Sequence, residues 1–388
     1  MDAHAEIARA IDSYRDKVVA LSHEIHERPE LKFQEHFAAG LLSKAATELG
    51  LEVEREVGGL KTAFRAEFGA KGPAVAILAE YDALPNGHSC GHNLIAGAAL
   101  SAVAGLKSIG GKLPGRVVFL GTPAEEGGGG KIILIDQGVL RGVDAAMMAH
   151  PTDAEFCTMP ALATQHLKLT FHGHGAHAAL APWDGSSALA AVIQTFQSVD
   201  AMRLHLRDGS RIHGIITDGG QAVNIIPEHA ECLFLARGKT SKYAKEMGAR
   251  VIRCAEGAAM ATGTRLEHVI EGGYKNLINN LSMAHRYAAH TEALGTKSVE
   301  APENTPTGST DMGDVSHVMP AIHPSFAISR RGEGNCHEDA FVAHADSQRG
   351  YDAMIRVAKA MAMTAYDLLA EPELLAAAKK EFEARKES

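Results

Sequence analysis

The sequence lacks the long apolar runs that mark membrane-spanning helices, since no window holds about 18 unbroken apolar residues. Residues 1–10 also lack the charged-then-apolar pattern of a secretion signal. There is no long basic run, and the formal net charge of -9 disfavours nucleic acid and anionic membranes as partners. The five cysteines are odd in number and scattered, unlike a disulfide framework. We therefore expect a cytoplasmic protein that binds neither nucleic acid nor a membrane.

Apolar runs and helical patterns alternate through the first part of the 388-residue chain. Runs at 74–79, 117–121 and 145–149 predict buried strands, and residues 94–109 and 132–137 predict helices between them. Such alternation is typical of a mostly parallel sheet that helices cover on both faces. The sequence therefore predicts an α/β fold for this part of the chain.

A different pattern begins at about residue 164. The next segments favour a strand, a helix, two strands, a helix and a strand, the β-α-β-β-α-β order of a ferredoxin-like α+β domain. The first pattern resumes near residue 276. We therefore expect an α/β domain made of residues 1–163 and 276–388, interrupted by a smaller domain at 164–275.

Three successive predicted strands end in residues that can bind metal ions. Cys90 and His92 follow the first strand, Glu125 and Glu126 follow the second, and His150 ends the third. In open α/β sheets, ligands gather outside the carboxyl ends of the strands, so we expect these side chains to meet. The single glycine between Cys90 and His92 lets both face one ion, although a buried thiol beside a turn histidine is the alternative.

The adjacent glutamates precede four glycines and a lysine. A phosphate-binding loop would need glycine at position 125 and serine or threonine at position 132, where the chain has Glu125 and Ile132. Two neighbouring carboxylates instead suit a division of labour, in which one binds metal and the other accepts a proton from water. A solvated turn is the alternative for such a pair.

Other candidates lie in the resumed part of the first domain. His337 stands in a tight loop that a glycine introduces, and the neighbouring Cys336 is interpreted as a packing thiol rather than a ligand. Asp311 and Asp314 are either groups that support the site or ordinary turn and cap residues, and the sequence does not separate these alternatives.

The smaller domain carries residues that suit contact with a substrate. Residues 173–178 echo a dinucleotide-binding fingerprint, but Asp200, at the distance of the expected acidic partner, falls within a predicted helix. His177 is better explained as a group that reaches toward a substrate. Asn224 and Arg237 are candidates for the same site, with a turn and a surface charge as the alternatives.

Together these motifs make the chain resemble the co-catalytic zinc aminoacylase/carboxypeptidase family. The closest likeness is to its amidohydrolase branch, which holds p-aminobenzoyl-glutamate hydrolase and the β-alanyl-dipeptide hydrolases. The motifs that carry this resemblance are Glu-Tyr-Asp-Ala-Leu-Pro at 80–85, Gly-His-Ser-Cys-Gly-His-Asn at 87–93, Gly-Thr-Pro-Ala-Glu-Glu-Gly-Gly-Gly-Gly-Lys at 121–131, His-Glu-Arg-Pro-Glu-Leu at 26–31 and Gly-His-Gly-Ala-His-Ala at 173–178.

The resemblance implies a catalytic domain with two metal ions, interrupted by a lid that forms a homodimer contact. The ligands that it implies are Cys90, His92, Glu126, His150 and His337. It makes Glu125 the general base, and we favour Cys90 as the ligand that bridges the two ions. A thiolate ligand biases the choice of metal toward zinc, with manganese or nickel as alternatives.

These expectations amount to a metal-dependent amidase that hydrolyses a small N-acyl amino acid or a dipeptide-like substrate. Asp82 would orient a ligand, and His177 would donate a hydrogen bond to the developing oxyanion. A strict dipeptidase is the first alternative. A non-catalytic metal- or ligand-binding protein on the same scaffold is the second.

Overall fold

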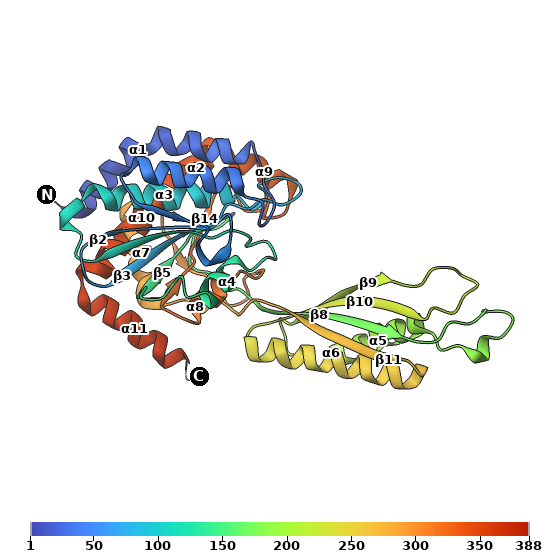
Figure 1. Ribbon diagram of the computed structural model, residues 1–388. Coiled ribbons are helices and arrows are strands. Elements are labelled where there is room, and N and C mark those ends of the chain that lie inside the picture. The colour runs from blue at the N-terminus through green and yellow to red at the C-terminus, as the bar shows by residue number, and fades with distance from the viewer. Residues whose placement is uncertain (1, 387–388) are drawn as a thin grey trace. The chain divides into compact units, whose positions relative to one another are not determined.

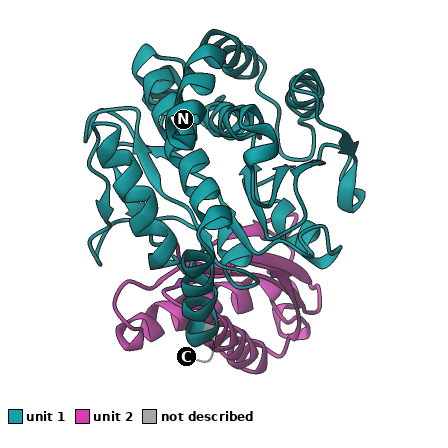
Figure 2. Ribbon diagram, turned by 90° about the vertical axis from the view of Figure 1, so that its left-hand side faces the viewer, with its two compact units in different colours: residues 1–160, 277–388 teal, residues 161–276 magenta. Residues whose placement is uncertain are grey.

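The computed structural model describes residues 2–386. The chain forms two compact units, unit 1 from residues 1–160 and 277–388 and unit 2 from residues 161–276 (Figure 2). Each unit has its own apolar core. No helix within residues 2–386 combines the length and the apolar character that crossing a bilayer requires.

The central sheet of unit 1 has the strand order β1-β2-β4-β3-β5-β13 (Figure 1). Its strands are β1 (Val53–Arg55), β2 (Phe64–Gly69), β3 (Ala74–Ala79), β4 (Arg116–Gly121), β5 (Ala145–Met147) and β13 (Ala321–Ile322). Strands β4, β3, β5 and β13 are parallel neighbours, whereas β1 and β2 add an antiparallel edge. The α/β prediction is confirmed, with a mixed sheet. Because Ala79 pairs with Gly121 and Ile77 with Met147, the carboxyl ends of β3, β4 and β5 lie at one edge.

A second, smaller sheet of unit 1 receives the chain directly after β5. Its order is β12-β7-β14-β6, with β6 (His150–Thr152), β7 (Phe156–Thr158), β12 (Val299–Glu300) and β14 (Ser325–Ala327). The predicted strand at 145–149 therefore ends early, and His150 begins β6 instead of ending the preceding strand. The cause is the neighbouring segment, since Met148 N–H donates to Ile322 O and His150 N–H to Pro324 O as the chain passes between the sheets.

Nine helices lie in the described part of unit 1. They are α1 (Ala3–His26), α2 (His36–Glu48), α3 (His92–Ser108), α4 (Gly130–Asp136), α7 (Leu281–Ala293), α8 (Met312–Ser316), α9 (Asp339–Ala345), α10 (Gln348–Ala370) and α11 (Pro372–Lys386). The small residues of α3 let α1 and α10 approach it closely. A Cβ at Gly97 would lie 2.4 Å from Met354 Sδ, and one at Gly105 would lie 2.7 Å from Ile11 Cγ1. This packing buries α3 along most of its length.

Helix α3 begins at His92, two residues before the predicted start. Gly91 precedes it with a φ of 68°, a left-handed conformation that favours glycine. A Cβ there would also lie 2.7 Å from Pro151 Cγ. Asn93 does not cap the helix, because its side-chain amide donates to Ser22 Oγ (3.0 Å) and Ala345 O (2.9 Å).

Unit 2 contains one four-stranded antiparallel sheet of order β11-β8-β10-β9. Its elements in chain order are β8 (Ala163–His172), α5 (Ala188–Met202), β9 (Arg211–Asp218), β10 (His229–Gly238), α6 (Ser241–Thr262) and β11 (Arg265–Gly272). Helices α5 and α6 pack against each other and against β8 and β10. Apolar side chains such as Leu169, Phe234 and Val251 fill the space between sheet and helices.

Candidate metal centre

The loops that follow β3, β4 and β5 meet at the carboxyl edge of the central sheet, as the parallel strand directions require. The first loop brings Cys90 and His92, and the second brings Glu126. One ligand atom of each of these three residues lies within 4.8 Å of the other two. Gly91 makes this possible, because its left-handed turn places the thiol and the imidazole on the same side of the loop.

Asp82 holds two of these residues in place. Its Oδ1 lies 3.2 Å from His92 Nδ1, and its Oδ2 accepts a hydrogen bond of 2.9 Å from the backbone N–H of Glu126. The contact with Nδ1 leaves Nε2 as the ring nitrogen of His92 that faces the centre. A carboxylate in this position fixes the orientation of a ligating histidine.

Three buried polar atoms at this centre have no hydrogen-bond partner: Glu80 Oε1, His92 Nε2 and Glu126 Oε1. They face one another, with His92 Nε2 lying 3.4 Å from Glu80 Oε1 and 4.0 Å from Glu126 Oε1. Burial opposes a charge on His92, but Glu80 and Asp82 raise the pKa of this histidine well above its usual value. Unpaired buried groups are costly, so their convergence indicates a site for a cation.

The turn before the two glutamates separates their environments. Ala124 has a φ of 61°, and its N–H donates to Glu35 Oε1 at 2.8 Å. The glycine run packs against this turn, because a Cβ at Gly130 would lie 1.8 Å from Pro123 O. Glu35 and the glycine run therefore hold the left-handed turn at Ala124, directly before the two glutamates.

The two glutamates differ in charge as well as in position. Burial, reinforced by Glu80 and Asp311, raises the pKa of Glu125 well above its usual value. Burial acts in the same direction on Glu126, but His337 and His92 outweigh it and lower the pKa of Glu126 to about 2. The two adjacent carboxyl groups therefore lie in environments that shift their pKa values in opposite directions.

His150 and His337 reach the same centre from other segments. The His150 ring centroid lies 5.6 Å from that of His92, and one ring nitrogen lies within 4.8 Å of ligand atoms of Glu80 and His92. His337 Nε2 lies 3.5 Å from Glu126 Oε1. The five residues predicted as ligands therefore gather in unit 1.

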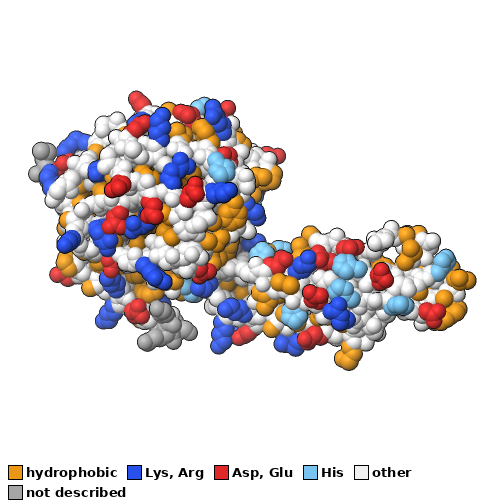
Figure 3. All heavy atoms as spheres, in the orientation of Figure 1, with side chains coloured by type: hydrophobic (Ala, Val, Ile, Leu, Met, Phe, Trp, Pro, Cys, Tyr) orange, Lys and Arg blue, Asp and Glu red, His pale blue; other side chains and the backbone are white. Residues whose placement is uncertain are grey.

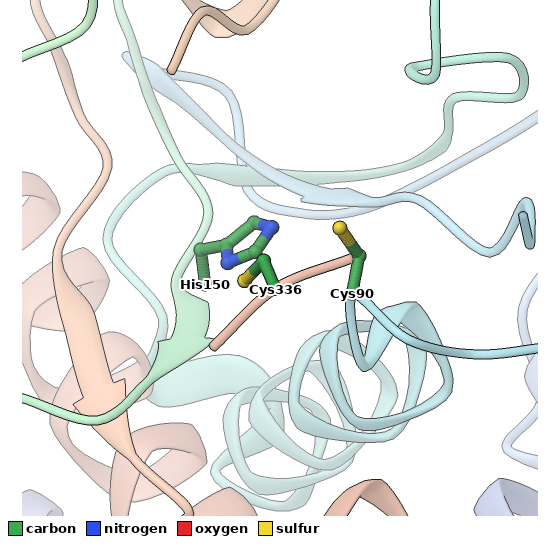
Figure 4. A group of neighbouring side chains, drawn as sticks. All are labelled: Cys90, His150 and Cys336. Atoms are coloured by element: carbon green, nitrogen blue, oxygen red, sulfur yellow. The ribbon is translucent and has the colours of Figure 1, made fainter. Parts of the chain in front are cut away.

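Cys336 packs against the apolar core of unit 1, in agreement with its interpretation as a packing thiol, and it also reaches the centre. Its Sγ lies within 4.8 Å of Cys90 Sγ and of a ring nitrogen of His150 (Figure 4). The three side chains come from the loop before α3, the start of β6 and the loop before α9. The same thiol lies 3.5 Å from Pro151 O, to which it can donate a hydrogen bond.

A buried ion-pair network that the sequence analysis did not predict lies beside the centre. Lys131 Nζ lies 2.6 Å from Glu80 Oε2 and 2.7 Å from Asp311 Oδ1, and all three side chains are inaccessible to solvent. Asp311 makes no cap hydrogen bond for α8, so of its two alternatives the structure favours support of the site. Glu80 directly follows a buried strand, and this position could have identified it as a residue of the site. Lys131 has no such position in the sequence pattern.

Two more buried histidines lie near the centre. The His323 ring centroid lies 5.6 Å from that of His150, and burial lowers the pKa of His323 to about 3. His88 lies 3.1 Å from Ile25 O through its Nε2. Both side chains are directed to backbone carbonyls, so their role is to support the neighbouring loops.

The three remaining predicted residues lie in unit 2. His177 and Asn224 are exposed and close together, since Ala178 N–H donates to Asn224 O at 2.9 Å and His177 pairs with Ile225. Arg237 lies near the other end of β10, eight residues beyond His229, or about 27 Å at ~3.4 Å per residue. The structure thus brings His177 and Asn224 together but not Arg237.

The donor set of the centre fits divalent metal ions. Thiol, imidazole and carboxylate groups are the usual protein ligands of zinc, and buried carboxylates without a full set of partners favour a cation. The orphaned atoms of Glu80, His92 and Glu126 point to the same conclusion from geometry alone.

Comparison with known proteins agrees with this chemistry. The model of peptidase family M20/M25/M40 matches residues 76–360. The Xaa-Arg dipeptidase of Mus musculus is 38% identical over 397 residues, which cover 97% of this chain and 91% of the relative. A p-aminobenzoyl-glutamate hydrolase polypeptide of Escherichia coli (strain K12) is 29% identical, with 94% of this chain and 92% of the relative covered.

Solved structures share the fold. A dinuclear metal-binding peptidase of Bacillus subtilis superimposes with a TM-score of 0.74 at 21% identity, covering 93% of this chain and 99% of that one. An aminobenzoyl-glutamate utilization protein of Klebsiella pneumoniae gives a TM-score of 0.74 at 18% identity, covering 93% and 98%.

The buried network predicts a large effect of Lys131→Met on stability. Removing the ammonium leaves Glu80 and Asp311 as buried, uncompensated charges, so we expect the free energy of unfolding of the metal-free chain to fall by about 3–5 kcal/mol. Urea unfolding measures this loss. Lys379→Met is the matched control, because Lys379 pairs with Asp144 at the surface with half of its side chain exposed, where a pair contributes about 0–1 kcal/mol. Equal losses in the two variants would contradict the account.

Proposed function

Because the chain belongs to peptidase family M20/M25/M40, we propose that it is a metal-dependent hydrolase that cleaves the amide bond of a dipeptide or of a small N-acyl amino acid. One observation carries the proposal. Thiol, imidazole and carboxylate groups from separate loops converge at one place in unit 1. Among the described residues, the buried atoms Glu80 Oε1, His92 Nε2 and Glu126 Oε1 of these groups have no hydrogen-bond partner. Beside them stands Glu125, a carboxyl group with a raised pKa.

We assign the five ligands to two ions from the way that they cluster. Cys90, His92 and Glu126 form one group, which His337 joins through its contact with Glu126. Cys90 and His150 belong to a second group. A third group contains Glu80, His92 and His150, so His92 as well as Cys90 belongs to two groups. We favour Cys90 as the bridging ligand, because its thiol joins His150 to the group that holds both His92 and Glu126. The thiolate favours zinc, with manganese and nickel as alternatives.

The ions would polarise the scissile carbonyl and lower the pKa of water, the usual contribution of such sites. Glu125 would accept the proton of the attacking water and deliver it to the leaving amine, as a general base and then a general acid. Asp82 holds His92 and the backbone of Glu126 in position throughout. The ammonium group of Lys131 pairs with Glu80 and Asp311 and so partly neutralises their negative charge beside Glu125.

We assign to unit 2, the ferredoxin-like domain of the sequence prediction, the roles of lid and homodimer contact. Strand β9 stands at the end of its sheet order, and large apolar side chains are exposed on this unit (Figure 3), among them Leu180, Trp183, Ile215 and Val223. Exposed apolar patches of this kind suit a protein partner. His177 would donate to the oxyanion when the lid closes, and Asn224 and Arg237 would contact the substrate.

The names of the relatives indicate which substrates to test first. Dipeptides ending in arginine, other dipeptides and N-acyl amino acids form the panel, and release of the free amino acid is measured before and after treatment with a chelator. Hydrolysis of dipeptides alone would favour the strict dipeptidase.

The different roles proposed for Glu125 and Glu126 predict that one substitution lowers turnover and the other lowers metal content. Glu125→Gln keeps the shape of the side chain but removes the proton acceptor, so we expect metal content near that of the wild type and turnover lower by about two or more orders of magnitude. Glu126→Gln removes an anionic ligand, so we expect loss of metal. Elemental analysis and steady-state kinetics on both variants make each the control for the other. Near-full activity of Glu125→Gln would disprove the base assignment.

The role of His177 predicts a loss in kcat rather than in affinity. His177→Ala should keep the fold and the metal content of the wild type while lowering kcat more than it raises KM, since the donor acts in the transition state. Mixing inactive His177→Ala chains with inactive Glu125→Gln chains then tests where the histidine acts. Activity regained in heterodimers would show that it acts across the dimer, and its absence there would place the histidine in its own chain. A larger effect on KM than on kcat would contradict the oxyanion role.

A further inference from the structure

Cys336 occupies a position that the five proposed ligands do not explain. Its thiol, Cys90 Sγ and a ring nitrogen of His150 all lie within 4.8 Å of one another (Figure 4). A thiol that served packing alone would be expected among apolar side chains. Cys336 does pack against the apolar core of unit 1, but it also lies beside another thiol and an imidazole, at the edge where buried carboxylates converge.

Counting donors around each ion shows what is missing. The group of Cys90, His92 and Glu126, joined by His337, offers four donors to one ion. His150 lies outside that group; it clusters with Cys90 and Cys336, and also with Glu80 and with His92, which the first group already includes. Zinc in catalytic sites has three protein ligands, so an ion held by His150 and Cys90 has room for one further donor.

Two side chains are close enough to supply the third donor. Glu80 lies within 4.8 Å of His92 and His150, but its other carboxylate oxygen is held by Lys131 at 2.6 Å. Cys336 is the second candidate, and its contact with Pro151 O at 3.5 Å is a weak one to give up. The thiol is therefore the donor that can turn to an ion at the smaller cost.

We propose that Cys336 is a further ligand of the metal centre, which together with Cys90 and His150 gives one of the two ions a coordination by two sulfurs and one nitrogen. This assignment rests on the proposed function for the presence of two ions. Metal binding by Cys336 releases the thiol proton to solvent and forms one metal–sulfur bond, with no change of oxidation state. Two thiolates on one ion bias that position toward soft and borderline metals, with zinc favoured over manganese.

The probes are cobalt(II) and zinc(II), each added by itself to the full-length chain after a chelator has removed bound metal. Cobalt bound to thiolate absorbs in the near ultraviolet, so the band reports sulfur ligation independently of activity. We expect Cys336→Ala to lower the affinity for one of the two ions by at least about tenfold. Even the loss of a residue that only hydrogen-bonds to a metal ligand lowers metal affinity by about tenfold or more. We also expect Cys336→Ala to lower the charge-transfer absorbance at saturation, with the other ion unaffected.

Cys157→Ala is the matched control, because Cys157 is a buried free cysteine of unit 1 that lies in β7 and belongs to none of the candidate metal clusters within residues 2–386. It should match the wild type in both measurements. If Cys336→Ala fails to fold, X-ray absorption at the zinc edge of the wild-type chain replaces it. That spectrum should show more zinc–sulfur bonds per chain, at about 2.3 Å, than Cys90 forms as a bridge.

The possible outcomes distinguish the assignment of Cys336 as a ligand from the proposed hydrolase function on which it rests. A wild-type chain that takes up no ion would overturn both. Two ions in the wild type, with unchanged affinities and absorbance in Cys336→Ala, would overturn the assignment of Cys336 and leave the proposed hydrolase intact. A zinc-edge spectrum with no sulfur beyond that of Cys90 would do the same.

Discussion

An excess of buried negative charge at one edge of the central sheet is the constraint on which the rest of this structure depends. The side chains of Glu80, Asp82, Glu125 and Asp311 are buried, and that of Glu126 is only 13% exposed. Lys131 compensates part of this charge by pairing with two of the five carboxylates. Burying unpaired charges costs several kcal/mol each, so the remaining carboxylates need protons or cations nearby. Against the effect of burial, Glu80 and Asp82 raise the pKa of His92, and burial raises the pKa of Glu125, so both shifts favour the protonated forms.

Metal ions and protons therefore compete for the same donors. A divalent ion in contact with Cys90, His92 and Glu126 would supply the positive charge that the buried carboxylates lack, and would displace protons as it binds. The scaffold holds the donors close together before any ion arrives. Parallel strands deliver the loops to one edge, and the close packing of α3 against α1 and α10 supports the helix end that carries His92. The strain of Ala124 is tolerated because Glu35 and the glycine run hold the turn.

Much of this arrangement follows from local sequence patterns. Buried strands, helical periodicity and the rule that ligands collect at strand ends together predict the α/β fold and bring Cys90, His92, Glu125 and Glu126 to one place. The change of sheet at His150 could not be predicted, because it depends on hydrogen bonds to residues 322–324, far away in the sequence.

The rest of the centre depends on contacts between distant segments. Lys131 pairs with Asp311 across 180 residues, and Cys336 lies 246 residues from Cys90. Neither has a pattern in its own neighbourhood that distinguishes it from an ordinary surface lysine or packing thiol. The separation of Arg237 from Asn224 likewise follows from the length of β10, which sequence patterns place only approximately.

The central claim is that the buried donors of unit 1 form a two-ion site, and the stoichiometry of metal binding tests it most directly. Chelator-treated wild-type chain is saturated with zinc, freed of excess metal by gel filtration and measured by elemental analysis against protein concentration. We predict two zinc ions per chain, because the donors form overlapping groups of three and are together more than one ion can bind. Zinc no higher than in a buffer-only background would contradict it.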